Sequence, residues 1–171
     1  TMETLSKLPP SFQKDGIVTA GNASGIVDGA AAVVVTREKT AKERGLKPLG
    51  RIVSWAAVGV DPSIMGIGPV PSTRKALQFA GLSLSQIDRV EVNEAFAAQY
   101  LAVEKQLGLS REKTNVNGGA IALGHPLAAS GTRLVITVLN ELRRKGLKYG
   151  VATACIGGGQ GIAMIVEALG N

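Results

Sequence analysis

The 171-residue chain contains one cysteine, one histidine and few aromatic residues, which make up 4% of the sequence. A single cysteine excludes an internal disulfide framework and is typical of a reducing compartment. With one histidine and no Cys-x-x-Cys spacing, a metal site has no support. No apolar run approaches the roughly 18 to 20 residues that span a bilayer, and the first residues resemble neither a signal peptide nor a transit peptide. We therefore expect a soluble protein without membrane contact.

The apolar residues that are present are small and aliphatic. Hydrophobic residues make up 45% of the chain, and most are Ala, Val, Ile and Leu, which is typical of α/β layers. The 22 glycines cluster at turns and not in a low-complexity tract. The formal charge of +6 comes mainly from basic residues in helical stretches without interleaved aromatics, so nucleic-acid binding is not predicted.

Hydrophobic periodicity and turn residues predict alternating strands and helices. Strands are expected at residues 30–36, 50–60, 89–92, 150–156 and 161–168, with a brief strand at 114–117. Helices are expected at 37–44, at 72–80 with Ser72 as N-cap, at 95–107 and at 134–145. The last two strands are close enough to form an antiparallel hairpin. The predicted fold class is α/β, a mixed five-stranded sheet with helices on both faces, after a connector at residues 1–25.

Three loops carry side chains of a catalytic kind. Asn93 follows one predicted strand, Cys155 lies near the end of another, and His125 precedes Pro126 in a loop that runs into a helix. Proline confines the preceding residue to extended backbone and imidazole titrates near neutrality, so His125 is presented as a catalytic base would be. A thiol can move a proton, an amide can fix a water or an oxyanion, and glycine amides can face negative charge. Together these groups are typical of an acyl-transfer or carbanion site.

Each of these residues also has a structural interpretation. Taken alone, Cys155 is a small buried residue at a strand end, Asn93 is a helix cap, and His125 is a surface-loop or core-capping histidine. The glycines at 157–161 superficially resemble a dinucleotide-binding loop, but they join two strands and not a strand and a helix, which argues against that function.

Longer motifs carry a resemblance to a known family. The segments VNEAFAAQ (92–99), NGGAIALGHP (117–126) and CIGGGQG (155–161) resemble, in order and separation, the three C-terminal signatures of the thiolase family. TAGNASG (19–25) and DPSIMG (61–66) also match, so the resemblance extends over essentially the whole chain.

The resemblance implies the C-terminal half of a thiolase. Residues 1–25 would end a loop region, and residues 26–171 would form the C-terminal domain, one half of an αβαβα layered fold. In the family, a nucleophilic cysteine from the N-terminal half takes an acyl group from 3-ketoacyl-CoA, releases acetyl-CoA and passes the acyl group to CoA. The reverse reaction condenses two acyl-CoAs. The sole cysteine here belongs to the C-terminal signature, so the chain alone is expected to be inactive. Thr1 precedes Met2, which suggests a segment of something longer.

The same resemblance implies a role for each motif residue. His125 would activate the nucleophile and help hold the thioester oxygen, and Asn93 would fix a water in that oxyanion site. Cys155 would protonate the leaving acetyl-CoA carbanion and deprotonate the incoming CoA thiol. The Gly157 amide would contribute to a second oxyanion site.

Substrate binding and partners follow from the resemblance as well. The residues expected to contact CoA or the acyl chain are Ala20, Gly21, Ser24, Met65, Ala95 and Phe96. CoA and acyl-CoA would be substrates, with no covalently bound cofactor, and the positive charge would face the CoA phosphates. The whole protein would serve fatty acid and lipid metabolism as a homodimer or homotetramer, in the mitochondrial matrix or the cytoplasm.

Two points stay open. Ala128 stands where the family usually has glycine, so the histidine loop is strained if that residue needs a positive φ, and otherwise the change is mild. The rival interpretation is a stand-alone, non-catalytic thiolase-like module that binds CoA or a partner protein. Retention of Asn93, His125 and Cys155 together favours the enzyme, because binding alone has no need of a proton-shuttling thiol.

Overall fold

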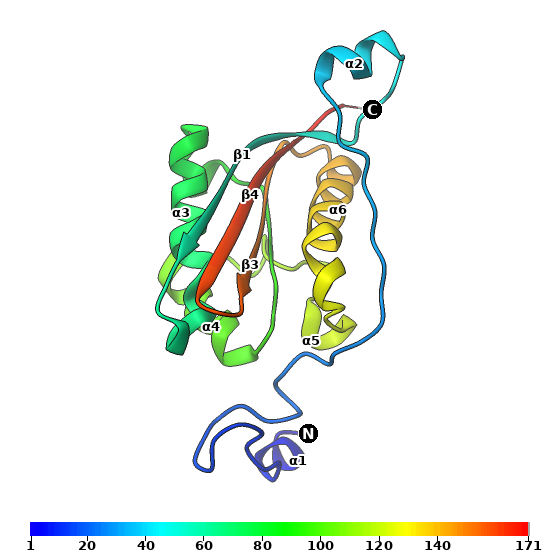
Figure 1. Cartoon of the computed structure of the whole chain (residues 1–171). Coiled ribbons are helices and arrows are strands. Elements are labelled where there is room, and N and C mark those ends of the chain that lie inside the picture. The colour runs from blue at the N-terminus through cyan, green and yellow to red at the C-terminus, as the bar shows by residue number, and fades with distance from the viewer. Residues whose placement is uncertain (171) are drawn as a thin grey trace.

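A mixed sheet of four strands forms the centre of the fold in the computed structural model, which describes residues 1–170 (Figure 1). The strands are β1 (Gly50–Gly59), β2 (Arg89–Val92), β3 (Tyr149–Ile156) and β4 (Gln160–Ala168), in the order β1-β4-β3-β2. β2 is parallel to β3, and β4 is antiparallel to both of its neighbours. The predicted hairpin of the last two strands is confirmed by the pairing of Ile156 with Gln160.

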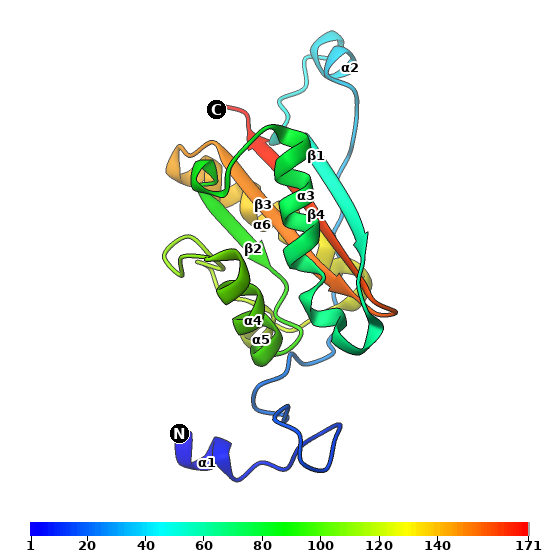
Figure 2. The same cartoon turned by 90° about the vertical axis from the view of Figure 1, so that its left-hand side faces the viewer.

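Helices lie on both faces of this sheet, as predicted. α3 (Pro69–Ala80) and α4 (Ala97–Leu107) lie on one face, and α6 (Leu127–Lys145), preceded by the short α5 (Ala120–Leu123), lies on the other (Figure 1, Figure 2). The remaining helices are α1 (Met2–Ser6), α2 (Glu38–Glu43) and the 3-10 turns η1 (Pro62–Ile67) and η2 (Leu84–Gln86). The α/β fold class is therefore confirmed. Within residues 1–170, no helix has both the length and the apolar character needed to cross a membrane.

Each face of the sheet has its own apolar core. On the α3 face the buried residues include Val70, Val92, Val103, Val151 and Ile165, and on the α6 face they include Leu134, Val138, Leu142, Ala152 and Val166. Full burial of one Val, Leu or Ile side chain contributes about 1.5–3 kcal/mol. The two clusters therefore fix how α3 and α6 lie on the sheet, and with them the loops at the strand ends.

The predicted strand at residues 30–36 is wrong. Residues 24–37 carry no helix or strand, and Val34 and Val35 are 93% and 73% exposed. The segment runs outside α6, away from the sheet (Figure 1). A β-branched run forms a strand only where a neighbouring strand can pair with its backbone, and within residues 1–170 this segment has none. The sheet therefore has four strands where five were predicted.

The brief strand predicted at 114–117 is reduced to one isolated bridge between Val90 and Thr114. The reason is Asn115, whose φ of 48° turns the chain out of the extended conformation.

The start of α3 also differs from the prediction. The helix begins at Pro69, so Ser72 lies inside it and not at its N-cap, and its hydroxyl donates to the Gly68 carbonyl over 2.9 Å. Proline is favourable in a first turn because the N–H it lacks has no helical partner there.

Candidate functional site

Asn93 and Cys155 lie at the same end of the sheet. Val92 of β2 is opposite Thr153 of β3, and the Asn93 N–H donates to the Thr153 carbonyl over 2.9 Å. Asn93 therefore follows β2 directly, and Cys155 lies two residues beyond Thr153 in β3. Open α/β sheets bind ligands at the carboxyl ends of their parallel strands. In Figure 1 this is the lower end of the sheet, where the β3–β4 hairpin turns and α6 begins.

His125 contacts Asn93 directly. Its Nε2 lies 3.3 Å from Asn93 Nδ2, and its Nδ1 lies 2.6 Å from Ser130 Oγ. The Ser130 hydroxyl also donates to the Pro126 carbonyl over 3.2 Å. The NH₂ group of Asn93 can only donate, so Nε2 accepts from it, and the neutral ring then carries its hydrogen on Nδ1, which donates to Ser130 Oγ. The imidazole is held in the tautomer that a base acting through Nε2 needs.

The ionisation of the two titratable groups suits proton transfer. Burial lowers the pKa of His125 and the positive charge of Arg133 lowers it further, so the imidazole is neutral near pH 7. Burial raises the pKa of the Cys155 thiol, so the thiol is protonated at that pH. The site therefore holds one group able to accept a proton and one able to donate it.

These groups reach the end of the sheet from opposite faces. Side chains alternate along a strand, so Cys155 shares a face with Val151, which is buried in the α3 core, whereas Asn93 shares the α6 face with Glu91. Within residues 1–170, the Cys155 thiol makes no hydrogen bond to Asn93 or His125. The structure thus brings His125 and Asn93 together and leaves Cys155 across the sheet end from them. A ligand lying across this end meets both sides.

Asn93 does not cap the helix that follows it. α4 begins at Ala97, with Phe96 as N-cap and no side-chain hydrogen bond to its first turn. Asn93 is 1% exposed, and its Oδ1 has no hydrogen-bond partner within residues 1–170. A buried amide oxygen without a donor costs about 1–3 kcal/mol, so this oxygen is suited to hold a water or another donor beside His125.

The glycine run after Cys155 has two different uses. A Cβ on Gly161 would lie 2.0 Å from the Gly68 carbonyl oxygen, and one on Gly159 would lie 2.4 Å from the Val60 carbonyl oxygen. These two glycines allow the hairpin to pack against the segment around η1. A Cβ on Gly157, by contrast, would meet no atom within 4 Å. A Cβ on Gly158 would meet no atom within 4 Å either, although its φ of 85° already favours glycine. Gly157 and Gly158 are therefore the glycines of this run whose surroundings leave room for a ligand.

Three of the residues expected to bind CoA come together beside Asn93. The hydroxyl and the N–H of Ser24 both donate to the Ala95 carbonyl, over 3.1 and 3.0 Å, and Ala23 forms an isolated bridge with Phe96.

The other three lie in neighbouring turns. Ala20 and Gly21 belong to the turn before Ser24, and Gly21 packs closely on Leu5. Met65 is half-buried in η1, where the adjacent Gly66 packs against Gln99 of α4.

Glu94 holds the loop that leads to His125, although the sequence reasoning assigned it no function. Its Oε1 accepts from Asn115 Nδ2 over 2.9 Å, and its Oε2 accepts from the Ile121 N–H over 3.2 Å. The Asn115 amide in turn bonds the N–H and the carbonyl of Val92 over 2.9 and 3.0 Å. The sequence feature that could have indicated this role is the position of Glu94 in the motif VNEAFAAQ, directly after Asn93.

A buried ion pair lies behind the contact of His125 with Asn93. Arg133 Nη1 donates to Glu91 Oε2 over 3.3 Å, and Glu91 is 2% exposed. Burial raises the pKa of Glu91 to about 7, against the opposite effect of the Arg133 charge. The same guanidinium lowers the pKa of His125, so the pair belongs to the electrostatic surroundings of the site.

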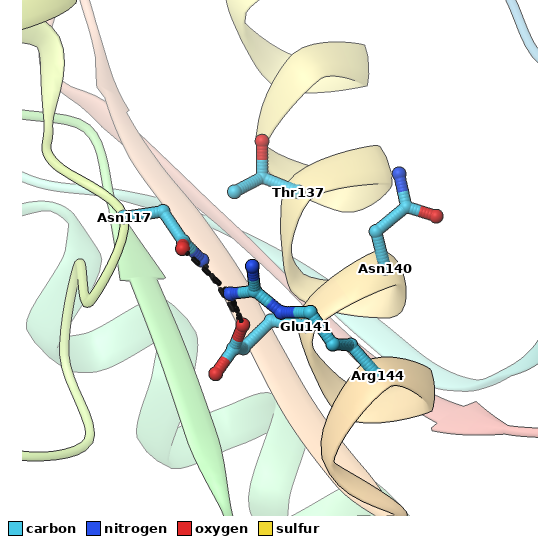
Figure 3. Close-up of a pocket in the computed structure, with 5 residues that line it drawn as sticks. All are labelled: Asn117, Thr137, Asn140, Glu141 and Arg144. Atoms are coloured by element: carbon cyan, nitrogen blue, oxygen red, sulfur yellow. Dashed lines mark hydrogen bonds and ion pairs between the residues drawn. The ribbon is translucent and has the colours of Figure 1, made fainter.

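A polar hollow lies on α6, and none of Asn93, His125 and Cys155 lines it (Figure 3). It is lined by Asn117, Thr137, Asn140, Glu141 and Arg144. Arg144 donates to Asn117 Oδ1 over 2.8 Å and pairs with the buried Glu141, which also accepts from Asn117 Nδ2. These partners satisfy one another and tie the loop at Asn117 to α6, so the hollow has a structural role.

Ala128 causes no backbone strain. It lies in the first turn of α6, and Asn115 is the one non-glycine residue with a positive φ within residues 1–170. Residue 128 therefore does not need a positive φ, and alanine in place of the usual glycine is a mild change.

Two family models match the chain. The model described as thiolase, C-terminal domain, matches residues 46–168, and the model described as thiolase, N-terminal domain, matches residues 1–39. Residues 30–36 fall in the N-terminal match, in agreement with their lack of a partner strand in this sheet.

Curated relatives match over nearly the whole chain. The mitochondrial 3-ketoacyl-CoA thiolase of Bos taurus is 63% identical over 167 residues, which are 98% of this chain and 42% of that protein. The acetyl-CoA acetyltransferase of Escherichia coli is 60% identical over 169 residues, 99% of this chain and 43% of that protein. The chain thus spans less than half the length of these relatives.

Solved structures show the same fold. Human mitochondrial 3-ketoacyl-CoA thiolase in complex with CoA matches with a TM-score of 0.91 and 59% identity. The acetyl-CoA acetyltransferase of Bacillus anthracis matches with a TM-score of 0.95 and 56% identity. Both matches cover 99% of this chain and 43% of the other chain.

Proposed function

The chain belongs to the thiolase family, and from that premise we propose that it is the C-terminal part of a CoA-dependent acyltransferase. The reaction is thiolytic cleavage of 3-ketoacyl-CoA, or in reverse the condensation of acetyl-CoA to acetoacetyl-CoA. The observation that carries the proposal is the contact of His125 with Asn93 at the sheet end that also holds Cys155. The names of the relatives and the CoA complex of the human enzyme support the substrate class.

His125 acts in the first half of the reaction. Its Nε2 accepts the proton of a nucleophilic cysteine supplied from outside this chain, and the thiolate attacks the 3-keto carbonyl. The bond between C2 and C3 of the substrate breaks, and its electron pair stays on acetyl-CoA as an enolate. The Nε2–H of His125 and a water held by Asn93 donate to the thioester oxygen, where the negative charge develops.

Cys155 acts in both halves of the reaction. Its thiol protonates C2 of the enolate, which releases acetyl-CoA, and the resulting thiolate takes the proton of the incoming CoA thiol. The CoA thiolate attacks the acyl group, and the Gly157 N–H donates to the oxyanion of the tetrahedral intermediate. The nucleophilic cysteine then leaves as a thiolate and recovers its proton from His125.

Binding follows the clustering of the remaining residues. Ser24, with Ala20 and Gly21 before it, contacts the pantetheine arm of CoA next to Ala95, and Met65 and Phe96 line the acyl pocket. The whole protein acts as a homo-oligomer in the mitochondrial matrix or the cytoplasm, without a covalently bound cofactor. The division of the chain at residue 25, between a connector and the C-terminal domain, is part of the same proposal.

A full-length chimera tests this function. The chain replaces the 167 matched residues of the mitochondrial 3-ketoacyl-CoA thiolase of Bos taurus, and formation of acetyl-CoA from acetoacetyl-CoA and CoA is followed. We expect turnover, and we expect His125→Asn to slow the acyl-enzyme burst in rapid-quench measurements, because an amide can donate a hydrogen bond but cannot take the thiol proton.

The outcomes separate the enzyme from its rival. A folded chimera that binds CoA without any turnover would favour the non-catalytic CoA-binding module. An active chimera whose burst rate is unchanged by His125→Asn would remove His125 from activation of the nucleophile. Thr137→Ala on the polar hollow is the control and should leave the burst unchanged.

A further inference from the structure

Residues 22–29 cross both loops of the candidate site, and we call them the crossing segment. Near its start, the Ser24 N–H donates to the Ala95 carbonyl in the loop after β2, over 3.0 Å. One residue further on, the Gly25 carbonyl accepts the N–H of His125 over 2.8 Å. Main-chain hydrogen bonds of consecutive residues thus connect the two loops that carry Asn93 and His125.

Two close contacts flank the bond to His125. Gly124 has a φ of 94°, and a Cβ built on it would lie 2.5 Å from a methyl carbon of Val27. A Cβ built on Gly29 would lie 2.7 Å from Cβ and 2.8 Å from Cγ of Pro126. The residues on both sides of His125 are therefore packed against the crossing segment with no room for another carbon atom.

Pro126 confines the backbone of His125 to extended conformations, but local structure leaves the position of the histidine loop against the sheet weakly fixed. α5 before it has four residues, and Pro126, the N-cap of α6, makes no side-chain capping bond. Gly124 is of the residue type with the widest choice of backbone conformation. The restraint on the histidine loop must come from tertiary contacts, and the crossing segment supplies them.

We propose that Gly25, Val27 and Gly29 are positioning residues that set the imidazole of His125 against Asn93 without touching substrate. The proposal rests on the role of His125 given above. A displacement of about 1 Å at a reacting group can lower turnover about 100-fold. A methyl group at Gly29 must displace Pro126. Because Pro126 directly follows His125, this displacement moves the imidazole and lowers the rate of proton transfer.

The single histidine allows a direct test on the chain itself, because one imidazole signal is followed by NMR. In the 171-residue chain we expect Gly29→Ala to move the titration of His125 toward the ordinary imidazole pKa and to weaken the Nδ1–H tautomer signal. Gly59→Ala is the matched control, since a Cβ there meets no atom within 4 Å. Identical titrations of the parent chain and Gly29→Ala would overturn the proposal.

Kinetics of the chimera separate this proposal from the proposed function. We expect Gly29→Ala to lower kcat about 10- to 100-fold while KM for CoA changes less than about twofold, and Gly59→Ala to keep the parent values. An inactive parent chimera counts against the proposed function, and the NMR titration then decides the positioning. An active parent with unchanged kcat in Gly29→Ala contradicts the positioning.

A second variant covers the case in which Gly29→Ala prevents folding. Val27→Ala removes methyl groups beside Gly124 and adds no atom. We expect Val27→Ala to shift the His125 titration in the same direction as Gly29→Ala does, but by less. A folded Val27→Ala chain with the parent titration would overturn the proposal.

Discussion

Nδ1 of His125 lies 2.6 Å from the hydroxyl of Ser130, whose own hydrogen is donated to the Pro126 carbonyl. This arrangement selects the tautomer with a free lone pair on Nε2. We expect Ser130→Ala to mix the two tautomers, detected in nitrogen NMR spectra of the single histidine, and to lower kcat of the chimera about 10- to 100-fold. Ser130→Thr keeps the hydroxyl and serves as the control. A tautomer signal that is unchanged in Ser130→Ala would show that the Ser130 hydroxyl does not select the tautomer.

Cys155 is predicted to act as an acid and a base. In the chimera, Cys155→Ala should lower turnover about 10²- to 10⁴-fold with little change in CoA affinity, the range expected for loss of a general acid and base. Because burial raises the pKa of this thiol, its alkylation rate in the parent chain should rise with pH through a midpoint above the ordinary thiol value. Near-normal thiolysis by Cys155→Ala would leave this residue with a packing role only.

Glu94 is predicted to be necessary for the order of the loop before His125. Its carboxylate accepts from Asn115 Nδ2 and from the Ile121 N–H, and a glutamine in its place turns an NH₂ group toward one of these donors. We expect Glu94→Gln to cost about 1–3 kcal/mol of unfolding free energy and to speed amide exchange at residues 115–123. Glu38→Gln on the exposed face of α2 is the control. Equal exchange rates in both variants would contradict this function of Glu94.

Residue spacing predicts the elements that bury one face against the sheet. The pattern of Leu134, Val138 and Leu142 indicates α6 because residues three to four apart lie on one helix face, and all three are buried. The run at 30–36 shows the limit of this reasoning. β-branched residues favour extended backbone, but their sequence does not say whether a partner strand is available.

The candidate site was predictable only in part, for a similar reason. Asn93, His125 and Cys155 each have a structural interpretation when taken alone, and they were identified because they stand in long motifs. Ser130 and Glu94 are ordinary polar residues until the fold places a ring nitrogen or an amide donor beside them. Their importance depends on hydrogen bonds across 5 and 27 residues of sequence, which no local pattern records.

Glu91 makes the stability of the chain depend on pH. Its pKa is about 7 in the fold, compared with the ordinary 4.5 expected in the unfolded chain. Between about pH 4.5 and about pH 7 the folded state binds a proton that the unfolded state has lost, so this contribution to stability is lost as pH rises through about 7. Relative to Glu91→Gln, the free energy of unfolding of the parent chain should fall by at most about 3 kcal/mol across this pH range. Chemical denaturation at each pH measures this free energy. Parallel pH profiles would mean that Glu91 ionises at its ordinary pKa.

The last prediction concerns the apolar surface that the isolated chain exposes. Trp55 is 59% exposed and Ile162 is 37% exposed, on the face of the sheet that α6 leaves partly open, and Val34 is 93% exposed. Surfaces of this kind drive association, so we expect the chain to fold and to self-associate, with a mass in sedimentation velocity that rises with concentration. Trp55 is the only tryptophan, so a blue shift of its emission at high concentration reports burial of this face, and Trp55→Ser should weaken both effects. A monomer whose tryptophan stays fully quenchable would contradict this expectation.

The isolated chain should also bind CoA weakly and lack thiolase activity, because its one thiol is assigned to proton transfer. Sustained turnover that is abolished by alkylation of Cys155 would show instead that this thiol is the nucleophile.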